Sequence, residues 1–242
     1  MKQLYVVGIG PGAYEKMTGE AVAALKKCEA IAGYQVYIDL VKADFPDKQW
    51  IVTGMMHEKE RCELAFASAD SDVTTAIVCS GDAGVYGMAG IVLELSVNYP
   101  EVEVCVVPGV TAALAGAAVL GAPLGHDFAV VSLSDLLTPW EVIEKRLLGA
   151  AMADFVLCLY NPSSKKRADY LEKACRILME YKSPQTKCGY VRQIGRDGED
   201  YQLCTLAELE EKKVDMFTTV FVGNASTKII ANRLVTPRGY QI

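Results

Sequence analysis

Short apolar runs alternate with stretches of helical periodicity along most of the chain, and this alternation is the feature that most constrains its fold. In the first half, the strand-like runs are residues 4–9, 30–33, 74–79 and 102–107. Between the last two runs, Met88, Ile91, Val92 and Leu95 recur at the spacing of one helix face. Strands that alternate with helices predict βαβ units and a mostly parallel sheet.

The same alternation continues in the second half, after a connection that contains Gly and Pro. Its strand-like runs are residues 129–133, 155–160, 188–193, 201–204 and 218–222. Helices are predicted at 140–148, 167–181 and 206–212, the last with Thr205 and Glu208 in a capping box. We therefore expect two α/β domains, at 1–117 and 128–242, joined by a linker at 118–127.

Composition excludes several classes of protein. The net charge of −6 argues against a nucleic-acid-binding protein, which needs a basic face. No apolar run reaches the roughly 20 residues of a membrane span, and the start of the chain does not resemble a signal peptide. The eight cysteines are scattered and lie partly in apolar runs, as reduced buried thiols do. We expect a cytoplasmic protein without a metal site.

Four turns rich in glycine or proline follow predicted strands. They are GIGPGAY at 8–14, SGDAGVYG at 80–87, PGVTAA at 108–113 and LYNPSS at 159–164. Open α/β sheets bind ligands at the carboxyl ends of their strands, where free amides and helix N-termini meet. These turns are therefore predicted to line one ligand pocket.

Two of these turns are open to a second interpretation. Gly8, Gly10 and Ala13 match the glycine pattern of dinucleotide-binding enzymes, which keeps an NAD-dependent dehydrogenase as an alternative. Pro11, which lacks an amide, and the missing acid after the second strand count against it. Asp82 can accept hydrogen bonds from a ligand or cap the helix that follows.

Taken in order, the motifs resemble those of the tetrapyrrole methylases, which transfer a methyl group from S-adenosylmethionine to precorrin-type rings. The family's opening G-x-G-P-G is GIGPG here, its G-D-P-x-x-Y-G is GDAGVYG, and its Pro-Gly turn is PGVTA. Ala83 replaces the usual proline. The resemblance implies two α/β domains with the cofactor in the cleft between them, and a homodimer.

The second half is similar to one subgroup of this family. The stretches SLSDLLTPW, YNPSSKKR and GRDGE resemble the enzymes that methylate C17 of precorrin-3B, or of its cobalt-bearing equivalent, and contract the ring. The implied pathway is cobalamin biosynthesis, with S-adenosylhomocysteine as the second product. Another precorrin methyltransferase and a non-catalytic protein of the same fold remain alternatives.

The resemblance also implies site residues. Cofactor contacts fall on Pro11, Ser80, Gly81, Asp82, Val85, Tyr86, Thr111, Ala112, Tyr160, Ile194 and Thr218 or Thr219. Cationic groups that suit the carboxylates of the ring are Lys165, Lys166, Arg167, Arg192 and Arg196. Candidates for proton transfer or substrate contact are His126, Ser132, Ser134 and Asp135. His126 can also bridge the domain connection, Asp135 can be a turn residue, and residues 165–167 can be a solvated helix start.

Overall fold

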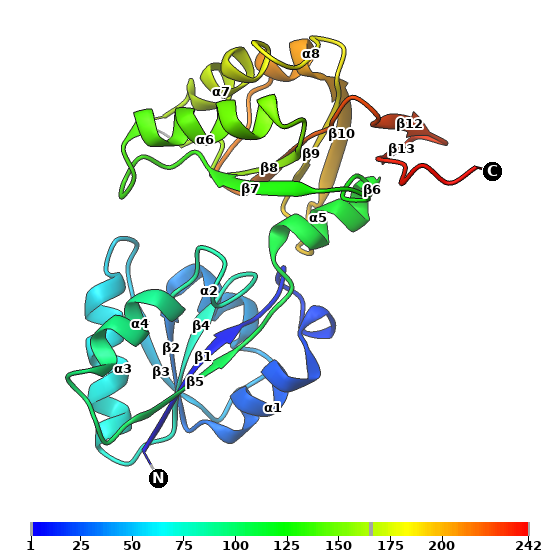
Figure 1. Ribbon diagram of the computed structural model, residues 1–242. Coiled ribbons are helices and arrows are strands. Elements are labelled where there is room, and N and C mark those ends of the chain that lie inside the picture. The colour runs from blue at the N-terminus through cyan, green and yellow to red at the C-terminus, as the bar shows by residue number, and fades with distance from the viewer. Residues whose placement is uncertain (1, 165–166, 242) are drawn as a thin grey trace. The chain divides into compact units, whose positions relative to one another are not determined.

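The computed structural model describes residues 2–164 and 167–241. It divides the chain into two compact units, Met1–Ala112 and Ala113–Ile242, each built around its own sheet (Figure 1). The predicted boundary at 117 lies five residues further along, inside the helix α5 (Ala112–Leu120). The two predicted α/β domains therefore correspond to the two units, with an earlier division between them.

The first unit contains a five-stranded sheet in the order β3-β2-β4-β1-β5. Its strands are β1 (Gln3–Gly8), β2 (Ala30–Tyr34), β3 (Gln49–Thr53), β4 (Thr75–Cys79) and β5 (Glu103–Val107). All neighbouring pairs are parallel, as the alternation predicts. The carboxyl ends of all five strands consequently lie at one edge of this sheet.

Helices cover both faces of the first sheet (Figure 1). One face carries α1 (Gly19–Lys27) and α2 (Gln35–Val41), and the other carries α3 (Glu58–Asp70) and α4 (Ala89–Ser96). The hydroxyl oxygen of Thr18 accepts a hydrogen bond from the amide of Ala21 at 3.0 Å, which makes Thr18 the N-cap of α1. Fully buried Leu25 and Phe66 anchor α1 and α3 to opposite faces.

The second unit contains a mixed sheet in the order β10-β9-β11-β8-β7. Its strands are β7 (Phe128–Ser132), β8 (Val156–Tyr160), β9 (Lys187–Arg192), β10 (Asp200–Thr205) and β11 (Thr218–Val222). Only the β7–β8 pair is parallel among these described strands, whereas β11 runs antiparallel to β8 and β9. Since β8 and β9 are both antiparallel to β11, the carboxyl ends of β7, β8 and β9 share one edge.

One face of this sheet packs against α6 (Trp140–Met152), α7 (Tyr170–Leu178) and α8 (Leu206–Glu210). The capping box predicted at α8 is present, with reciprocal hydrogen bonds between Thr205 and Glu208. Helix α5 lies on the other face, where a Cβ at Gly116 would come within 2.9 Å of the Phe221 ring. Helix α7 is shorter than the predicted 167–181.

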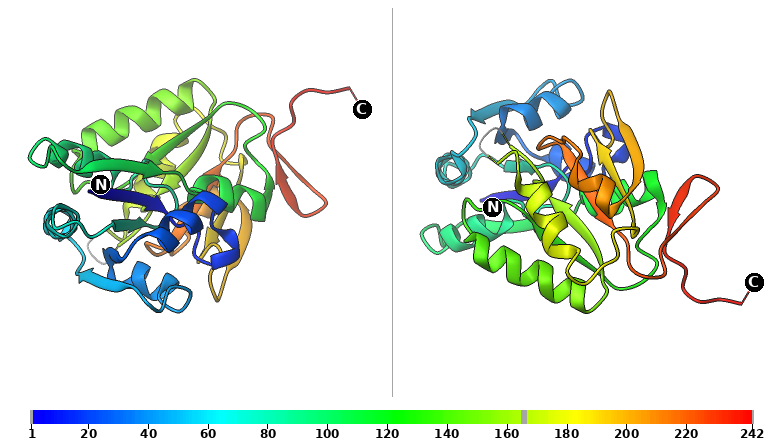
Figure 2. Two further views of the ribbon diagram at one scale, coloured as in Figure 1. Left: turned by 90° about the horizontal axis from the view of Figure 1, so that it is seen from below. Right: turned by 90° about the horizontal axis from the view of Figure 1, so that it is seen from above.

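The segment predicted as a linker, 118–127, is a structured part of the second unit. It contains β6 (Gly121–Ala122), which pairs with β13 (Arg233–Val235), and β13 pairs in turn with β12 (Lys228–Ile230). The guanidinium of Arg233 also donates a hydrogen bond to the carbonyl of Val119 at 2.6 Å. Figure 2 shows the hairpin formed by β12 and β13 at the periphery of the second unit.

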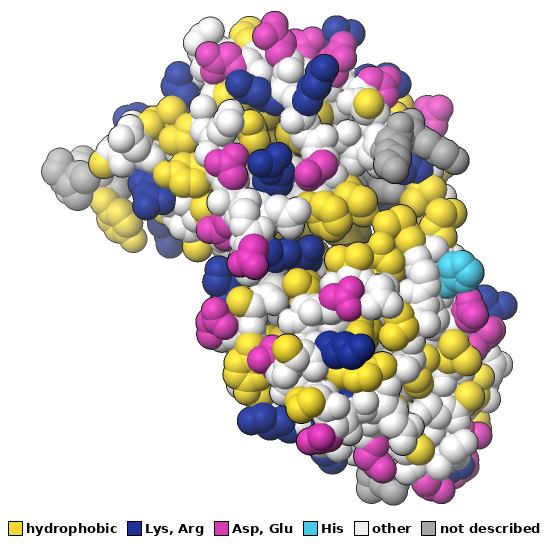
Figure 3. All heavy atoms as spheres, turned by 180° about the vertical axis from the view of Figure 1, so that it is seen from behind, with side chains coloured by type: hydrophobic (Ala, Val, Ile, Leu, Met, Phe, Trp, Pro, Cys, Tyr) yellow, Lys and Arg dark blue, Asp and Glu magenta, His cyan; other side chains and the backbone are white. Residues whose placement is uncertain are grey.

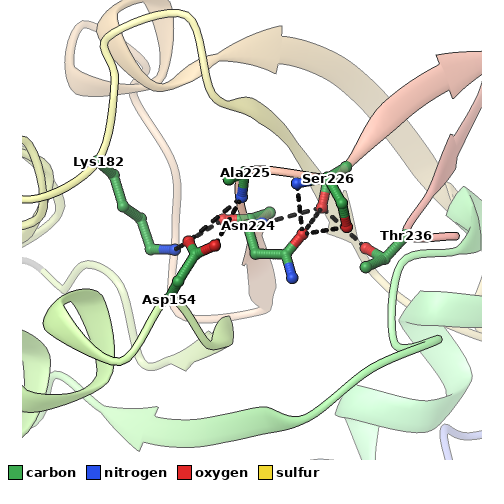
Figure 4. A network of polar contacts seen from close by, with 8 residues as sticks. Asp154, Lys182, Asn224, Ala225, Ser226 and Thr236 are labelled. Atoms are coloured by element: carbon green, nitrogen blue, oxygen red, sulfur yellow. Dashed lines mark hydrogen bonds and ion pairs between the residues drawn. The ribbon is translucent and has the colours of Figure 1, made fainter. Parts of the chain in front are cut away.

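A network of hydrogen bonds holds the chain that follows β11 in place (Figure 4). The ammonium of Lys182, whose side chain is buried, donates hydrogen bonds to the Asp154 carboxylate at 3.0 Å and to the Gly223 carbonyl at 3.1 Å. The same carboxylate accepts the amide of Ala225, and the side-chain oxygen of Asn224 accepts three hydrogen bonds from its own turn. Because Asp154 precedes β8 and Gly223 follows β11, this network joins the start of β8 to the end of β11.

The surface of each unit carries interspersed charges. Figure 3 shows acidic and basic side chains mixed over the visible face of both units. Within residues 2–164 and 167–241, no helix combines the length and the apolar composition that a membrane crossing requires.

Candidate functional site

Three glycine turns meet at the carboxyl edge of the first sheet. Strand β1 lies between β4 and β5, so the turns that follow these strands are neighbours. Gly10 and Gly81 exchange backbone hydrogen bonds of 2.9 and 2.8 Å, which join the first two turns. The first three of the four predicted turns therefore converge at this edge, whereas the fourth, at 159–164, belongs to the second unit.

The backbones of these turns approach so closely that only glycine fits. A Cβ at Gly109 would lie 2.2 Å from the carbonyl oxygen of Gly81 and 2.6 Å from that of Gly8. A Cβ at Gly8 would in turn lie 2.7 Å from the amide nitrogen of Gly109. The glycines thus allow three strand ends to form one continuous surface of backbone.

Asp82 clamps two of the turns together. One carboxylate oxygen accepts the amides of Gly84 and Val85 at 2.8 and 3.0 Å, and the other accepts the amide of Gly109 at 2.9 Å. Helix α4 begins only at Ala89, with Met88 at the N-cap, so Asp82 does not cap that helix. Asp82 therefore shapes the site through these backbone amides, and its contact with the cofactor stays a prediction.

Backbone hydrogen bonds also control the charge of Asp82. Partial burial alone would raise its pKa, but the amides of Gly109, Gly84 and Val85 outweigh that effect and lower the pKa below its usual value. The carboxylate consequently stays ionised, and the clamp stays intact, throughout the neutral range.

Exposed side chains stand beside this clamp. Tyr86 is 56% exposed and occupies the left-handed backbone region with φ of 54°, and Val85 is 37% exposed. Such a backbone conformation is costly for a tyrosine and is concentrated at functional sites. The other cofactor residues predicted here lie on the same three turns, namely Pro11, Ser80, Gly81, Thr111 and Ala112.

The glycine turn at 8–12 does not have the geometry of a dinucleotide site. The amide of Gly10 already donates to Gly81, and only a short 3-10 helix (Tyr14–Lys16) follows before α1 begins at Gly19. A dinucleotide-binding turn instead leads straight into a helix whose N-terminus faces the pyrophosphate. The observed turn therefore disfavours the dehydrogenase interpretation.

Polar side chains gather at the carboxyl edge of the second sheet. Ser132 and Tyr160 are register partners at the ends of β7 and β8. The Ser132 hydroxyl accepts the side-chain amide of Asn161 at 3.0 Å, and the Tyr160 hydroxyl accepts the amide of Ala113 at 2.6 Å. Asn161 has a left-handed φ of 53°. Asn161 was not predicted, although it lies in the YNPSS turn.

The end of β9 adds a further group at this edge. Arg192 is exposed at the end of the strand, opposite Thr218 of β11. Ile194 and Thr219 are buried, and the Arg196 guanidinium lies 5.7 Å from the Phe217 ring centroid. The assignments of Tyr160, Ile194 and Thr219 to the cofactor, and of Arg192 and Arg196 to the substrate, stay predictions.

The remaining predicted residues have different placements. Asp135 and Arg167 bind one another, and Tyr170, which was not predicted, completes this cluster. His126 is exposed and precedes β7, whereas Ser132 ends it, so the two lie at opposite ends of this strand. Lys165 and Lys166 lie outside the described residues.

Arg61 is a further residue that the sequence analysis missed. It is 4% exposed, and its guanidinium donates to the Thr53 hydroxyl at 2.8 Å and to the Gly54 carbonyl at 3.0 Å. A third nitrogen faces the Met88 sulfur at 3.6 Å. Arg61 thereby joins the end of β3 to the residue before α4. The sequence gives no signal of this role, because the partners Thr53 and Met88 lie 8 and 27 residues away from Arg61.

The fold and the strand-end turns define an α/β protein with a ligand site formed mainly by backbone. The model of the Tetrapyrrole (Corrin/Porphyrin) Methylases matches residues 3–210. The chain belongs to this family, which the motifs predicted, and is a methyltransferase.

Individual relatives match almost the whole chain. A Salmonella typhimurium protein named probable cobalt-factor III C(17)-methyltransferase is 50% identical over 99% of this chain and 100% of its own length. A Sinorhizobium precorrin-3B C(17)-methyltransferase is 39% identical over 98% of this chain and 96% of its own. The crystal structure of the methyltransferase CobJ superimposes with a TM-score of 0.90, at 35% identity, over 98% of this chain and 100% of that one.

Proposed function

We propose that this protein transfers a methyl group from S-adenosylmethionine to C17 of a precorrin-3-type ring, with ring contraction, in cobalamin biosynthesis. The observation that carries the proposal is the convergence of three glycine turns, two of them joined by the Asp82 clamp, in a chain that shares its motifs and nearly its whole length with C17-methyltransferases. The higher identity to the cobalt-factor III relative favours the cobalt-bearing ring as substrate.

The glycine turns suit S-adenosylmethionine. Its methyl sulfonium supplies an already activated methyl group, so the protein needs chiefly to hold donor and acceptor in line and to exclude water. The turns offer backbone groups at close range, and Tyr86 and Val85 offer apolar surface beside them. We assign Pro11, Ser80, Gly81, Thr111 and Ala112 to cofactor contact on the same basis.

The second unit supplies groups that suit the tetrapyrrole. Exposed Arg192 can bind a ring carboxylate, since a guanidinium matches a carboxylate bidentately. Of the residues predicted for proton transfer, Ser132 is the one that lies at the carboxyl edge with its hydroxyl in a hydrogen-bond network. We assign substrate contact to Ser132, Asn161, Arg192 and Arg196. Tyr160, Ile194 and Thr219 remain proposed cofactor contacts.

An anaerobic incubation with S-adenosylmethionine and either the cobalt-bearing or the metal-free ring tests this function. We expect one added methyl group by mass and a change in the absorbance spectrum with the cobalt-bearing ring. Methylation of the metal-free ring alone would overturn the choice of substrate. Binding of S-adenosylhomocysteine without methylation of either ring would overturn the C17 assignment. We also propose a cytoplasmic homodimer, which cell fractionation and light scattering test.

A further inference from the structure

The loop between β7 and α6, residues 133–139, is held at its centre by a polar cluster. The guanidinium Nε of Arg167 donates to one carboxylate oxygen of Asp135, and the hydroxyl of Tyr170 donates to the other at 2.6 Å. The Asp135 and Arg167 side chains are only 31% and 19% exposed. We call these three residues the Asp135 latch.

Both ends of the same loop are also fixed. Leu133 is fully buried and its amide donates to the carbonyl of Tyr160 at 2.8 Å. At the other end, the Trp140 ring packs on Tyr170 with centroids 4.6 Å apart. Tyr170, the first residue of α7, therefore makes two contacts. Its hydroxyl binds Asp135 in the loop, and its ring packs on Trp140, the first residue of α6.

The fixed loop presents an apolar tip to solvent. Leu137 is 98% exposed and Leu136 is 57% exposed, directly after the latch residue Asp135. The loop leaves the carboxyl end of β7 beside Ser132 and Asn161, the residues proposed to contact the substrate. An apolar tip at this edge matches the flat apolar face of a tetrapyrrole. The Ser132 hydroxyl and the Asn161 side-chain amide beside it are groups that suit the ring's carboxylates.

We propose that Asp135 is a positioning residue: the Asp135 latch holds loop 133–139 so that Leu136 and Leu137 contact the face of the tetrapyrrole. This inference rests on the proposed function and names the part of the second unit that binds the ring. The Tyr170 and Arg167 donors lower the pKa of Asp135, and the Asp135 carboxylate raises the pKa of Tyr170, so the phenol keeps its proton. A carboxylate held in this way is a poor general base.

Steady-state kinetics with S-adenosylmethionine at saturation separate positioning from catalysis. Asp135→Asn and Tyr170→Phe each remove part of the latch and should raise the KM for the ring, Asp135→Asn by about 10-fold, with kcat within about twofold of wild type. Asp127→Asn, at an exposed residue before β7, and Tyr181→Phe, at a 56% exposed residue, are matched controls. Loss of kcat in Asp135→Asn with an unchanged KM would make Asp135 catalytic and overturn the proposal.

A second measurement needs no catalysis. Limited thermolysin digestion of the unliganded full chain, followed by mass spectrometry, reports how often loop 133–139 opens. We expect faster cleavage in this loop for Asp135→Asn and Tyr170→Phe than for either control. Cleavage at the wild-type rate in both latch variants would overturn the latch, whether or not the wild-type protein methylates the proposed ring.

The apolar tip has its own test. Leu137→Asn keeps the latch and changes only an exposed side chain, so its thermal stability should match wild type. Its KM for the ring should rise by about 5-fold or more, because burial of a leucine on the ring is lost. A wild-type KM in this variant would show that the tip does not contact the substrate.

Discussion

Replacing Asp82 by Asn tests the clamp with the smallest possible change in shape. An asparagine retains one acceptor oxygen, so it can keep either the bonds to Gly84 and Val85 or the bond to Gly109. In either arrangement its NH₂ group faces a backbone N–H, and the turns at 80–87 and 108–113 lose their shared carboxylate.

The size of the effect follows from the hydrogen bonds. Leaving a half-buried amide unpaired costs about 1–3 kcal/mol. Because Asp82 is partly exposed, the expected cost is at the low end, about 1 kcal/mol. Because these turns form the proposed cofactor site, the affinity for S-adenosylhomocysteine should fall by about 5-fold at neutral pH. Asp82→Ala should have the larger effect, since it removes all three acceptor contacts.

Isothermal calorimetry with S-adenosylhomocysteine measures the affinity, and urea denaturation measures the free energy of unfolding. Asp44→Asn, at an exposed residue after α2, is the matched control and should leave both unchanged. Wild-type affinity and wild-type stability in Asp82→Asn would refute the clamp.

The lowered pKa of Asp82 adds a pH dependence with a defined sign. A carboxylate whose pKa is depressed by folding stabilises the folded protein at pH values above its unfolded pKa of about 4. This contribution is lost as the pH falls through the lowered value. The difference in stability between wild type and Asp82→Asn should therefore be constant from neutral pH to about pH 5 and shrink below about pH 4. A difference that grows on acidification would contradict the assigned direction.

Three further changes test other parts of the structure. Gly109→Ala places a Cβ 2.2 Å from the Gly81 carbonyl oxygen and should abolish measurable S-adenosylhomocysteine binding by calorimetry, whereas Gly90→Ala, with open space at its Cβ, should not. Lys182→Met removes a buried ammonium with two hydrogen bonds and should lower the free energy of unfolding by about 1–3 kcal/mol in urea denaturation; an unchanged value would mean that the Figure 4 network is not stabilising. Thr205→Ala removes the cap of α8 and should cost about 1 kcal/mol in the same assay, and no loss would contradict the capping role.

The convergence of the glycine turns in the first unit was predictable because its cause is local. Glycines at the ends of apolar runs mark turns where backbones approach, and parallel strands bring those turns to one edge. The partner of Asp82 was not predictable, because Gly109 lies 27 residues further along the chain. Local sequence therefore left the ligand and cap roles of Asp82 open; the structure excludes the cap of α4 and adds the contact with Gly109.

The second unit was harder to predict for a related reason. Strands β6, β12 and β13 span only two or three residues, too short for a period to be recognised, so the segment 118–127 looked like a linker. The Asp135 latch joins residues 32 and 35 positions apart. His126 suited the chemistry of proton transfer by residue type alone, and since it precedes β7 whereas Ser132 ends it, local sequence could not show whether the two act together.

The position of methylation tests the central claim most directly. Wild-type protein is incubated anaerobically with S-adenosylmethionine labelled with ¹³C in its methyl group and with the cobalt-bearing ring, and the product is examined by NMR. The account predicts one labelled methyl group, attached to C17 of a contracted ring. A label on any other ring carbon, or no label in a protein that binds S-adenosylhomocysteine, would contradict it.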